Sequence, residues 1–292
     1  MTAFDCSWPD ESDLMRAGTI REARKVDGRL EDYVSLDQVL SEHQVDTVFH
    51  LGAQTQVGDA LREPLATFEA NVRGTYNLLE ACRVHRDIVE RVVIASSDKA
   101  YGAMDGTAYT EARPLLGRYP YDVSKSCTDL LAQSYWHSYE LAVAIARCGN
   151  VFGGGDLNWD RIVPGTIKSL LAEERPVIRS DGLFTRDYIF VDDVVEAYKT
   201  LAEAIDRPEV RGNGFNFGPK APHSVLEVIA ELSVIMECTD LEPMILNQAN
   251  GEIVHQHLDS EKAARVLGWH VGSTFTDGLR RTVDWYRAYL SI

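Results

Sequence analysis

The chain has 292 residues, of which 45% are hydrophobic and 25% charged, so it can bury one large core or two modest ones. Its net charge of −16 argues against broad nucleic-acid binding, which needs a basic surface. No stretch approaches the roughly 20 apolar residues of a membrane span. The acidic start does not resemble a signal peptide, and the five cysteines form no CxxC pair. We therefore expect a cytoplasmic protein with reduced thiols.

The first half of the chain alternates between apolar strands and helices. Short β-branched runs predict strands at 47–51, 92–96 and 143–147, and apolar residues at three-to-four spacing predict helices at 68–82 and 124–139. Buried strands that alternate with helices indicate a parallel sheet covered on both faces. We expect the three strands to be neighbours in that sheet.

After about Gly153 the loops carry more Gly, Pro, Arg and Asp, and the elements become irregular. Residues 191–204 predict a helix, which Asp192 and Asp193 are expected to cap. Residues 224–269 are typical of a helix, a strand and a second helix. We infer a smaller lid unit interleaved with the sheet unit, with a ligand cleft at the carboxyl ends of the strands.

Three polar residues form the strongest catalytic candidate. Ser97 closes an apolar strand, which places its hydroxyl at the carboxyl edge of the sheet. Tyr121 and Lys125 are four residues apart and therefore share one helix face. A Lys ammonium near a phenol favours the phenolate and lowers its pKa, so Tyr121 could take a proton from a hydroxyl while hydride leaves the same carbon. The Tyr–Lys spacing alone also fits an ordinary surface helix, but its place after the Ser97 strand favours catalysis.

Six short segments resemble the extended short-chain dehydrogenases/reductases, in that family's order. They are His50-Leu-Gly-Ala-Gln54, Asn71-Val-Arg-Gly-Thr-Tyr-Asn77, Ser96-Ser-Asp-Lys-Ala-Tyr-Gly102, Tyr121-Asp-Val-Ser-Lys125, Arg147-Cys-Gly-Asn-Val151 and Arg186-Asp-Tyr-Ile-Phe-Val-Asp-Asp193. The resemblance covers nearly the whole chain. It implies an α/β fold with a Rossmann-like, doubly wound parallel sheet. It also implies a dinucleotide-binding domain of residues 1–152 and 183–210, and a smaller substrate domain of residues 153–182 and 211–292.

The same resemblance implies NAD as cofactor and a homodimer built from the helices at 68–82 and 124–139. The residues that it assigns to NAD are Asp5, Leu30, Ala53, Gln54, Asn71, Tyr121 and Lys125. By resemblance, Asn150, Arg161 and Arg186 hold the pyrophosphate and nucleotide of a nucleotide sugar. The alternative for Arg161, and less so for Arg186, is surface pairing with Asp156, Asp160 or Asp187. The histidines show no metal-binding spacing, so we assign no metal.

Two segments resemble the CDP-glucose 4,6-dehydratases in particular, namely Ser97-Asp-Lys99 and Gly153-Gly-Gly-Asp-Leu-Asn-Trp-Asp-Arg-Ile-Val-Pro164. The resemblance implies that NAD oxidises carbon 4 of a hexose, water leaves across carbons 5 and 6, and hydride returns at carbon 6. In these steps Tyr121 deprotonates the 4-hydroxyl, which Ser97 orients. Lys99 could remove the carbon 5 proton if burial depresses its pKa, and Asp98 could protonate the leaving hydroxyl if its pKa is raised. The alternative for Asp98 and Lys99 is an exposed turn pair.

The start of the chain departs from the family pattern. No G-x-x-G-x-x-G turn is present, and Met1–Asp5 resembles the end of the family's second strand, so we expect a sheet without the family's first strand. Arg29 stands where the family usually has Asp. A nucleotide-sugar epimerase or reductase, which would leave Asp98 and Lys99 idle, stays open as an alternative. So does a non-catalytic nucleotide-sugar-binding relative, and we expect this chain alone to bind NAD weakly.

Overall fold

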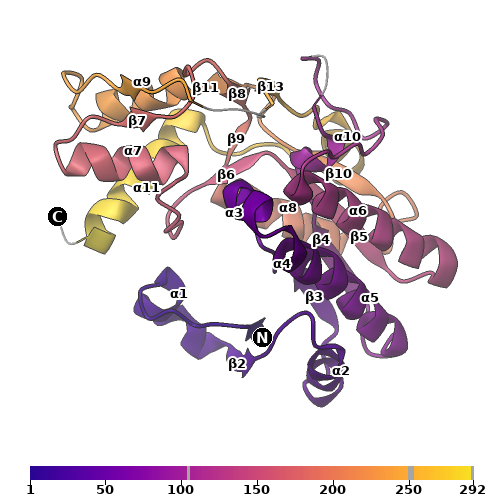
Figure 1. The fold of residues 1–292 in the computed structure, drawn as a ribbon. Coiled ribbons are helices and arrows are strands. Elements are labelled where there is room, and N and C mark those ends of the chain that lie inside the picture. The colour runs from indigo at the N-terminus through magenta and orange to yellow at the C-terminus, as the bar shows by residue number, and fades with distance from the viewer. Residues whose placement is uncertain (104–105, 249–252, 291–292) are drawn as a thin grey trace.

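The computed structural model describes residues 1–103, 106–248 and 253–290. A four-stranded parallel sheet lies at its centre (Figure 1). In pairing order the strands are β10 (Gly214–Phe217), β5 (Val143–Cys148), β4 (Arg91–Ala95) and β3 (Thr47–His50). The three runs predicted as neighbouring strands are β3, β4 and β5, so that prediction is confirmed.

Both faces of the main sheet are buried. Val92 and Ile94 point into the core on one face, whereas Val93 between them belongs to the core on the opposite face. This alternation follows from the period of two of a β-strand. Because neither face meets water, the strands appear in the sequence as continuous apolar runs.

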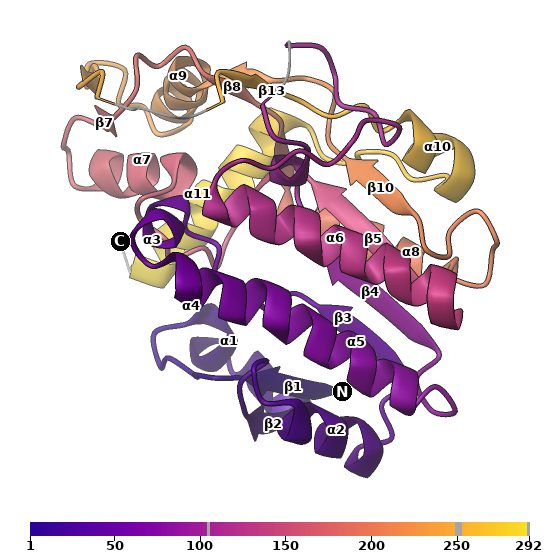
Figure 2. The same ribbon diagram turned by 45° about the vertical axis from the view of Figure 1, so that its right-hand side comes forward.

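Helices cover each of the two faces. On one face lie α2 (Tyr33–Glu42), α5 (Gly74–Val84) and α6 (Pro120–Tyr139), which contribute Leu79 and Ala132 to that core. On the other lie α8 (Val191–Glu203) and α10 (Glu261–Leu267), which contribute Leu201 and Ala263. Figure 2 shows α5 and α6 side by side across the sheet. The doubly wound arrangement is therefore confirmed. The helix predicted at 68–82 is a run of α4 (Pro64–Phe68), the π-helical turn η2 (Glu69–Arg73) and α5.

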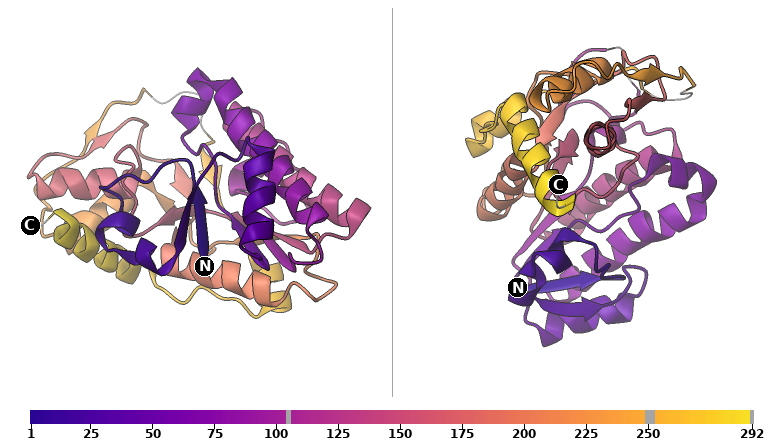
Figure 3. Two further views of the ribbon diagram at one scale, coloured as in Figure 1. Left: turned by 90° about the horizontal axis from the view of Figure 1, so that it is seen from below. Right: turned by 90° about the vertical axis from the view of Figure 1, so that its left-hand side faces the viewer.

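The first strands of the chain form a sheet of their own. β1 (Thr2–Asp5) pairs in parallel with β2 (Arg24–Asp27), and among the described residues β1 does not pair with β3. Between β1 and β2 lie α1 (Asp13–Arg16) and the short 3-10 helix η1 (Thr19–Glu22). In Figure 3 this strand pair is the indigo segment beside the mark of the N-terminus. The parallel arrangement is thus interrupted between β1 and β3, where the resemblance places the absent strand.

A second core lies beside the main sheet. It joins β6 (Asn150–Phe152) and β9 (Tyr188–Phe190), which pair in parallel, to three helices. These helices are α7 (Ile162–Leu171), α9 (Val225–Ile235) and α11 (Phe275–Leu290). The remaining short strands are β7 (Val177–Ile178), β8 (Thr185–Arg186), β11 (His223–Ser224), β12 (Met244–Ile245) and β13 (His255–Gln256).

The predicted domain boundary at residue 211 is wrong at β10. This strand lies in the predicted substrate domain, yet it pairs with β5 and completes the main sheet. Trp269, from the same predicted domain, also packs into the core of that sheet. The prediction followed a change in loop composition, which does not reveal where the chain returns to the sheet. The remainder of the division stays a prediction.

Candidate active site

A cavity of about 1240 Å³ opens at the carboxyl ends of β4 and β5 and reaches the start of α7. Seven of the residues predicted to act on substrate or cofactor line this cavity. They are Ser97, Asp98, Lys99, Tyr121, Lys125, Asn150 and Arg161. Residues that are up to 64 positions apart, from Ser97 to Arg161, therefore meet in one concave site, as the parallel-sheet prediction requires.

The turn after β4 presents three of these residues. Ser97 caps the 3-10 helix η3 (Asp98–Tyr101), since its Oγ accepts a hydrogen bond from the Lys99 N–H at 3.2 Å. The same Oγ donates to Asp98 Oδ1 at 3.0 Å. Asp98 is only 2% exposed, and its Oδ2 has no hydrogen-bond partner within the described part of the chain. The alternative of an exposed turn pair is thus wrong for Asp98.

Tyr121 and Lys125 lie one turn apart near the start of α6, as predicted. Lys125 is buried, and its Nζ donates to the main-chain oxygen of Ala95 at 2.8 Å. Burial lowers the pKa of Lys125 to about 8, because the charged ammonium loses its hydration. The alternative of a surface helix face is therefore wrong for this pair.

The structure corrects one electrostatic expectation. Burial raises the pKa of Tyr121 to about 12, and the nearby Asp98 carboxylate adds to the effect. Hydrogen bonding to Ser97 and the charge of Arg161 act in the opposite direction without reversing it. The predicted lowering of this pKa by Lys125 is thus wrong for the chain as described. The desolvation of the phenolate outweighs both the hydrogen bond with Ser97 and the charge of Arg161.

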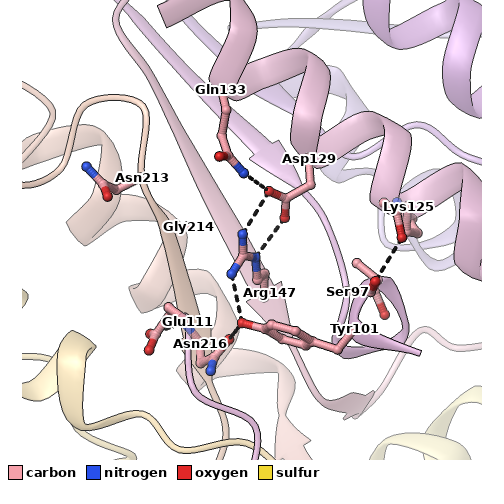
Figure 4. Close-up of polar contacts among 12 residues, drawn as sticks. Ser97, Tyr101, Glu111, Lys125, Asp129, Gln133, Arg147, Asn213, Gly214 and Asn216 are labelled. Atoms are coloured by element: carbon pink, nitrogen blue, oxygen red, sulfur yellow. Dashed lines mark hydrogen bonds and ion pairs between the residues drawn. The ribbon is translucent and has the colours of Figure 1, made fainter. Parts of the chain in front are cut away.

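A buried ion pair, which the sequence analysis missed, braces the site (Figure 4). Arg147 of β5 makes a bidentate contact with Asp129 of α6, with Nε–Oδ2 at 2.7 Å and Nη2–Oδ1 at 2.9 Å. Its Nη1 donates to the Tyr101 hydroxyl at 2.8 Å, and that hydroxyl donates to Asn216 Oδ1 at 2.7 Å. Tyr101 ends η3, so this network fixes the catalytic turn to α6, β5 and β10. An Arg inside an apolar strand was the available sequence signal.

The other predicted cofactor residues lie apart from the cavity lining. Asn71 is buried and ties the loop after β3 to α6: its Oδ1 accepts from Gln54 N at 2.7 Å and its Nδ2 donates to Ser124 Oγ at 2.9 Å. Ala53 precedes Gln54 in this loop. Leu30 packs so closely on Gly52 and Gly74 that a Cβ at either glycine would lie within 2.7 Å of it. Leu30, Ala53, Gln54 and Asn71 thus lie in or near the loop that follows β3, and their role in binding NAD stays a prediction.

Asp5 and the residues after it do not form a phosphate cradle. Asp5 is exposed at the end of β1 and accepts from Ser7 N at 3.2 Å. The helix that follows, α1, has four residues and is held against α11, since Arg16 Nη2 donates to Tyr289 O at 3.1 Å. A pyrophosphate needs several convergent backbone N–H groups at a helix start. The described residues near β1 do not supply them.

The predicted substrate residues are only partly brought together. Asn150 opens β6 at the cavity, and Arg161 lies at the N-terminal end of α7 with Nη1 at 3.1 Å from Asp156 Oδ2. The alternative pairing of Arg161 with Asp156 is thus present, although both residues line the cavity. Arg186 is buried outside the cavity lining, and its Nη1 donates to the main-chain oxygens of Thr185 and Val254 at 2.8 and 3.2 Å.

The expected capping by Asp192 and Asp193 is wrong. α8 has no side-chain cap. Asp193 instead accepts from Gly272 N at 2.8 Å, and Asp192 pairs with Arg281 at 2.6 Å. Both carboxylates serve contacts to the C-terminal segment, which sequence spacing does not reveal.

Among residues 1–103, 106–248 and 253–290, no cluster of three or more His, Cys, Asp or Glu is arranged to hold a metal. His50 is buried, and its Nε2 lies 3.0 Å from Thr75 Oγ1. No helix in the described part of the chain is long and apolar enough to cross a membrane.

A Ser, a Tyr and a Lys that converge at the carboxyl edge of a doubly wound parallel sheet define a short-chain dehydrogenase/reductase site. The sequence pattern of the NAD dependent epimerase/dehydratase family matches residues 8–218, so the chain belongs to that family. NAD is the cofactor of this family, as predicted. Tyr121 and Lys125 line the cavity, and their role toward the ribose and nicotinamide end of NAD stays a prediction. The described residues beside β1 do not fit its pyrophosphate.

Similar proteins include both dehydratases and epimerases. The chain is 29% identical to the CDP-glucose 4,6-dehydratase of Salmonella typhimurium, over 97% of this chain and 81% of the relative. It is 30% identical to the dTDP-glucose 4,6-dehydratase of Xanthomonas campestris, over 89% and 78%.

Two solved structures share the fold closely. One is the UDP-glucose 4-epimerase of Thermotoga maritima with UDP-glucose, at a TM-score of 0.86 and 28% identity, covering 92% of this chain and 86% of that one. The other is the dTDP-glucose 4,6-dehydratase of Streptomyces venezuelae with NAD bound, at a TM-score of 0.84 and 28% identity, covering 94% and 83%.

Proposed function

We propose that the chain is a nucleotide-sugar 4,6-dehydratase that acts on an NDP-hexose of the CDP-glucose type through a 4-keto intermediate. The observation that carries the proposal is the position of Asp98 and Lys99 next to Ser97, facing the same cavity as Tyr121. A 4-epimerase or a reductase needs one acid–base group at the carbon 4 oxygen and has no use for a second pair. The similarity to two 4,6-dehydratases supports the same function.

The site residues can be assigned to each proton transfer. NAD, when bound, supplies the hydride acceptor at carbon 4 and the hydride donor at carbon 6. Tyr121 must enter this step as the phenolate, although burial raises its pKa to about 12 in the described chain. The phenolate then receives the proton of the 4-hydroxyl, while Ser97 holds that oxygen. The Lys99 amine takes the carbon 5 proton, which the 4-ketone acidifies, and the electron pair forms the carbon 5–carbon 6 double bond. For the next step Asp98 must carry a proton: the carbon 6–oxygen bond breaks as Asp98 gives that proton, and water leaves. When hydride returns at carbon 6, the Lys99 ammonium returns a proton to carbon 5, which balances the reduction of the double bond.

The nucleotide side of the cavity is suited to a pyrophosphate. The ten-residue helix α7 begins at the cavity, and its first N–H groups have no side-chain cap. A helix start attracts anions through these N–H groups and the helix dipole. Arg161 at this end adds a guanidinium, and Asn150 adds an amide. These contacts support a nucleoside diphosphate as the carrier of the sugar, without selecting its base.

We also propose a homodimer through α5 and α6, the two helices predicted for this role. They pack against each other and carry exposed large side chains, namely Tyr76 (40% exposed), Leu130 (53%) and Tyr139 (48%). Apolar groups on two adjacent helices are typical of a surface that a partner covers. The second copy would contribute the same two helices, so four helices would meet at the interface.

The reaction class is tested by following hydrogen in D₂O. The chain is incubated with NAD and CDP-glucose, and separately with the UDP, dTDP and GDP analogues, and products are identified by NMR and mass spectrometry. A dehydratase gives a 4-keto-6-deoxy sugar with deuterium at carbon 5, because solvent supplies that proton. A 4-epimerase gives the carbon 4 epimer with no deuterium at carbon 5. The fold similarity to a UDP-glucose 4-epimerase makes this the second candidate.

Two variants separate the steps. Tyr121→Phe should lower turnover at least about 100-fold, the low end of the general-base contribution. Lys99→Ala should keep 4-keto formation and lose elimination. Lys220→Ala is the matched control, since Lys220 is exposed and pairs with Glu261 at 2.8 Å. Intact dehydration by Lys99→Ala would refute the proposed role of Lys99, whereas formation of the carbon 4 epimer without dehydration by the wild type would favour the epimerase.

The same assays are run on the 292-residue chain and on a form extended by a strand, a glycine-rich turn and a helix of the family type. The isotope position reports the reaction class at any rate of turnover. Absence of dehydration with every substrate in both forms would overturn the proposed function.

A further inference from the structure

We propose that Gln256 is a positioning residue, which holds the Lys99 amine in place for the elimination step; this inference rests on the proposed dehydratase function. Gln256 lies in β13, 157 residues from Lys99 in the sequence, and is 0% exposed. Its Oε1 accepts a hydrogen bond from Lys99 Nζ. Its Nε2 donates to the main-chain oxygen of Asp98 at 2.9 Å. One amide thus contacts both residues assigned to elimination.

The chemistry of the partners fixes the orientation of this amide. Lys99 Nζ carries N–H donors, so the oxygen of Gln256 must face it. The Asp98 carbonyl is only an acceptor, so the NH₂ group of Gln256 must face that atom. A Glu at this position could not donate to Asp98, and a Leu could make neither bond. Glutamine is therefore the residue type that satisfies both contacts without adding a charge.

The backbone around Gln256 is held on both sides. β13 pairs with β8, where Gln256 is opposite Arg186. The next two residues are also fixed: His257 O accepts from Tyr109 N at 2.9 Å, and Leu258 N donates to Asp187 Oδ2 at 2.6 Å. A side chain on such a support has little freedom to move. It can transmit this fixed position to the longer and more flexible lysine side chain.

This geometry has a consequence for the base. An amine removes a proton through its nitrogen lone pair, so one N–H held by Gln256 restricts the directions in which that lone pair points. Lys99 lines the cavity, where the substrate would lie. The neutral amide of Gln256 adds no charge beside Lys99, which already lies near the carboxyl groups of Asp98 and Asp122. A carboxylate at position 256 would further favour the ammonium form of Lys99.

The first test needs neither substrate nor cofactor. Lys99 is labelled with an amine-reactive reagent across a pH series, and the labelled peptide is quantified by mass spectrometry. Gln256→Glu should move the labelling midpoint of Lys99 upward by about one pH unit, since an opposite charge at this distance raises the pKa of an amine. Gln256→Leu should change the accessibility of Lys99 without that upward shift. Ser260→Ala is the control, because buried Ser260 donates to Gly218 O in the same segment.

The second test divides the reaction. Gln256→Leu should slow carbon 5 deuteration about 10- to 100-fold, the cost of a misplaced catalytic group, while 4-keto formation stays within about twofold. Gln256→Glu should move the pH profile of elimination upward with the labelling midpoint. Thermal unfolding of each variant shows whether it folds, and Gln256→Glu keeps the test available if Gln256→Leu does not.

An unchanged Lys99 labelling profile in Gln256→Glu would overturn the proposal. Equal slowing of oxidation and elimination would do the same, because it indicates a general structural role. If labelling shifts as expected but neither the wild-type chain nor its extended form deuterates carbon 5, the dehydratase function fails and the catalytic role of Gln256 fails with it. That result is distinct from failure of the contact itself.

Discussion

Replacing Asp129 with asparagine should destabilise the fold by about 3–5 kcal/mol, the usual cost of removing one partner of a buried ion pair. The Arg147 side chain is 5% exposed and that of Asp129 is 0% exposed, so water cannot replace the lost charge. Both carboxylate oxygens of Asp129 accept from Arg147. An asparagine keeps one acceptor and turns an N–H donor toward the guanidinium.

The assay is urea unfolding, followed by tryptophan fluorescence and circular dichroism. With a denaturant slope of about 3 kcal/mol per M, the expected loss lowers the midpoint by about 1 M or more. The control is Glu196→Gln, which removes a pair with Lys199 in which both side chains are more than half exposed. This control should cost less than about 1 kcal/mol.

Two results bear on the reasoning. If Asp129→Asn moves the midpoint no further than Glu196→Gln, the account of the buried charge is refuted. The double variant Asp129→Asn with Arg147→Met should recover part of the lost stability, because it removes the uncompensated charge as well. Recovery would show that desolvation of Arg147, rather than a lost packing contact, causes the defect.

Three further predictions follow from other parts of the structure. Burial raises the pKa of Asp187 from 3.8 to about 7, so the folded state binds this proton more tightly than the unfolded state, and stability falls as pH rises between those values. The loss is at most about 1.4 kcal/mol per pH unit. Asp187→Asn should remove it, which urea titrations at about pH 5 and about pH 8 would show. Leu130→Asp should convert a dimer to a monomer of 32.6 kDa by light scattering, and a monomeric wild type at micromolar concentration would contradict the proposed interface. Calorimetric titration should show that NAD binds much more weakly to this chain than to the form extended by a strand, turn and helix; micromolar binding by the unextended chain would mean that another segment cradles the phosphates.

The main sheet could be predicted because its cause is local. Val92, Val93 and Ile94 are apolar in succession, which is typical of a strand buried on both faces. The grouping of Ser97, Tyr121 and Lys125 could be predicted from the sequence for a similar reason. A strand end and a four-residue helical spacing each place a side chain before any tertiary contact is known.

Other features depend on contacts between distant parts of the chain. Gln256 reaches Lys99 only after β13 pairs with β8, and nothing near Gln256 in the sequence signals that contact. The high pKa of Tyr121 reflects how deeply the site is buried, which the spacing to Lys125 does not report. Asp193 has the composition of a helix cap but serves Gly272 instead.

The interruption of the sheet between β1 and β3 accounts for the size of the cavity. It also accounts for the lack of a pyrophosphate site near β1 in a chain whose family uses NAD. A cavity of about 1240 Å³ exceeds the roughly 300–1,000 Å³ of most ligand sites. Its lining includes Thr2 of β1 and Thr47 and Phe49 of β3, so part of the volume is the space between two strand edges. Each edge carries backbone groups that a parallel strand would satisfy, and exposed apolar edges are unfavourable. A strand followed by a glycine-rich turn in this space would satisfy both edges and place N–H groups where the pyrophosphate of NAD needs them. One such element would therefore satisfy both the open edges and the need for a phosphate cradle, which the described residues near β1 do not supply, while Ser97, Tyr121 and Lys125 line the same cavity.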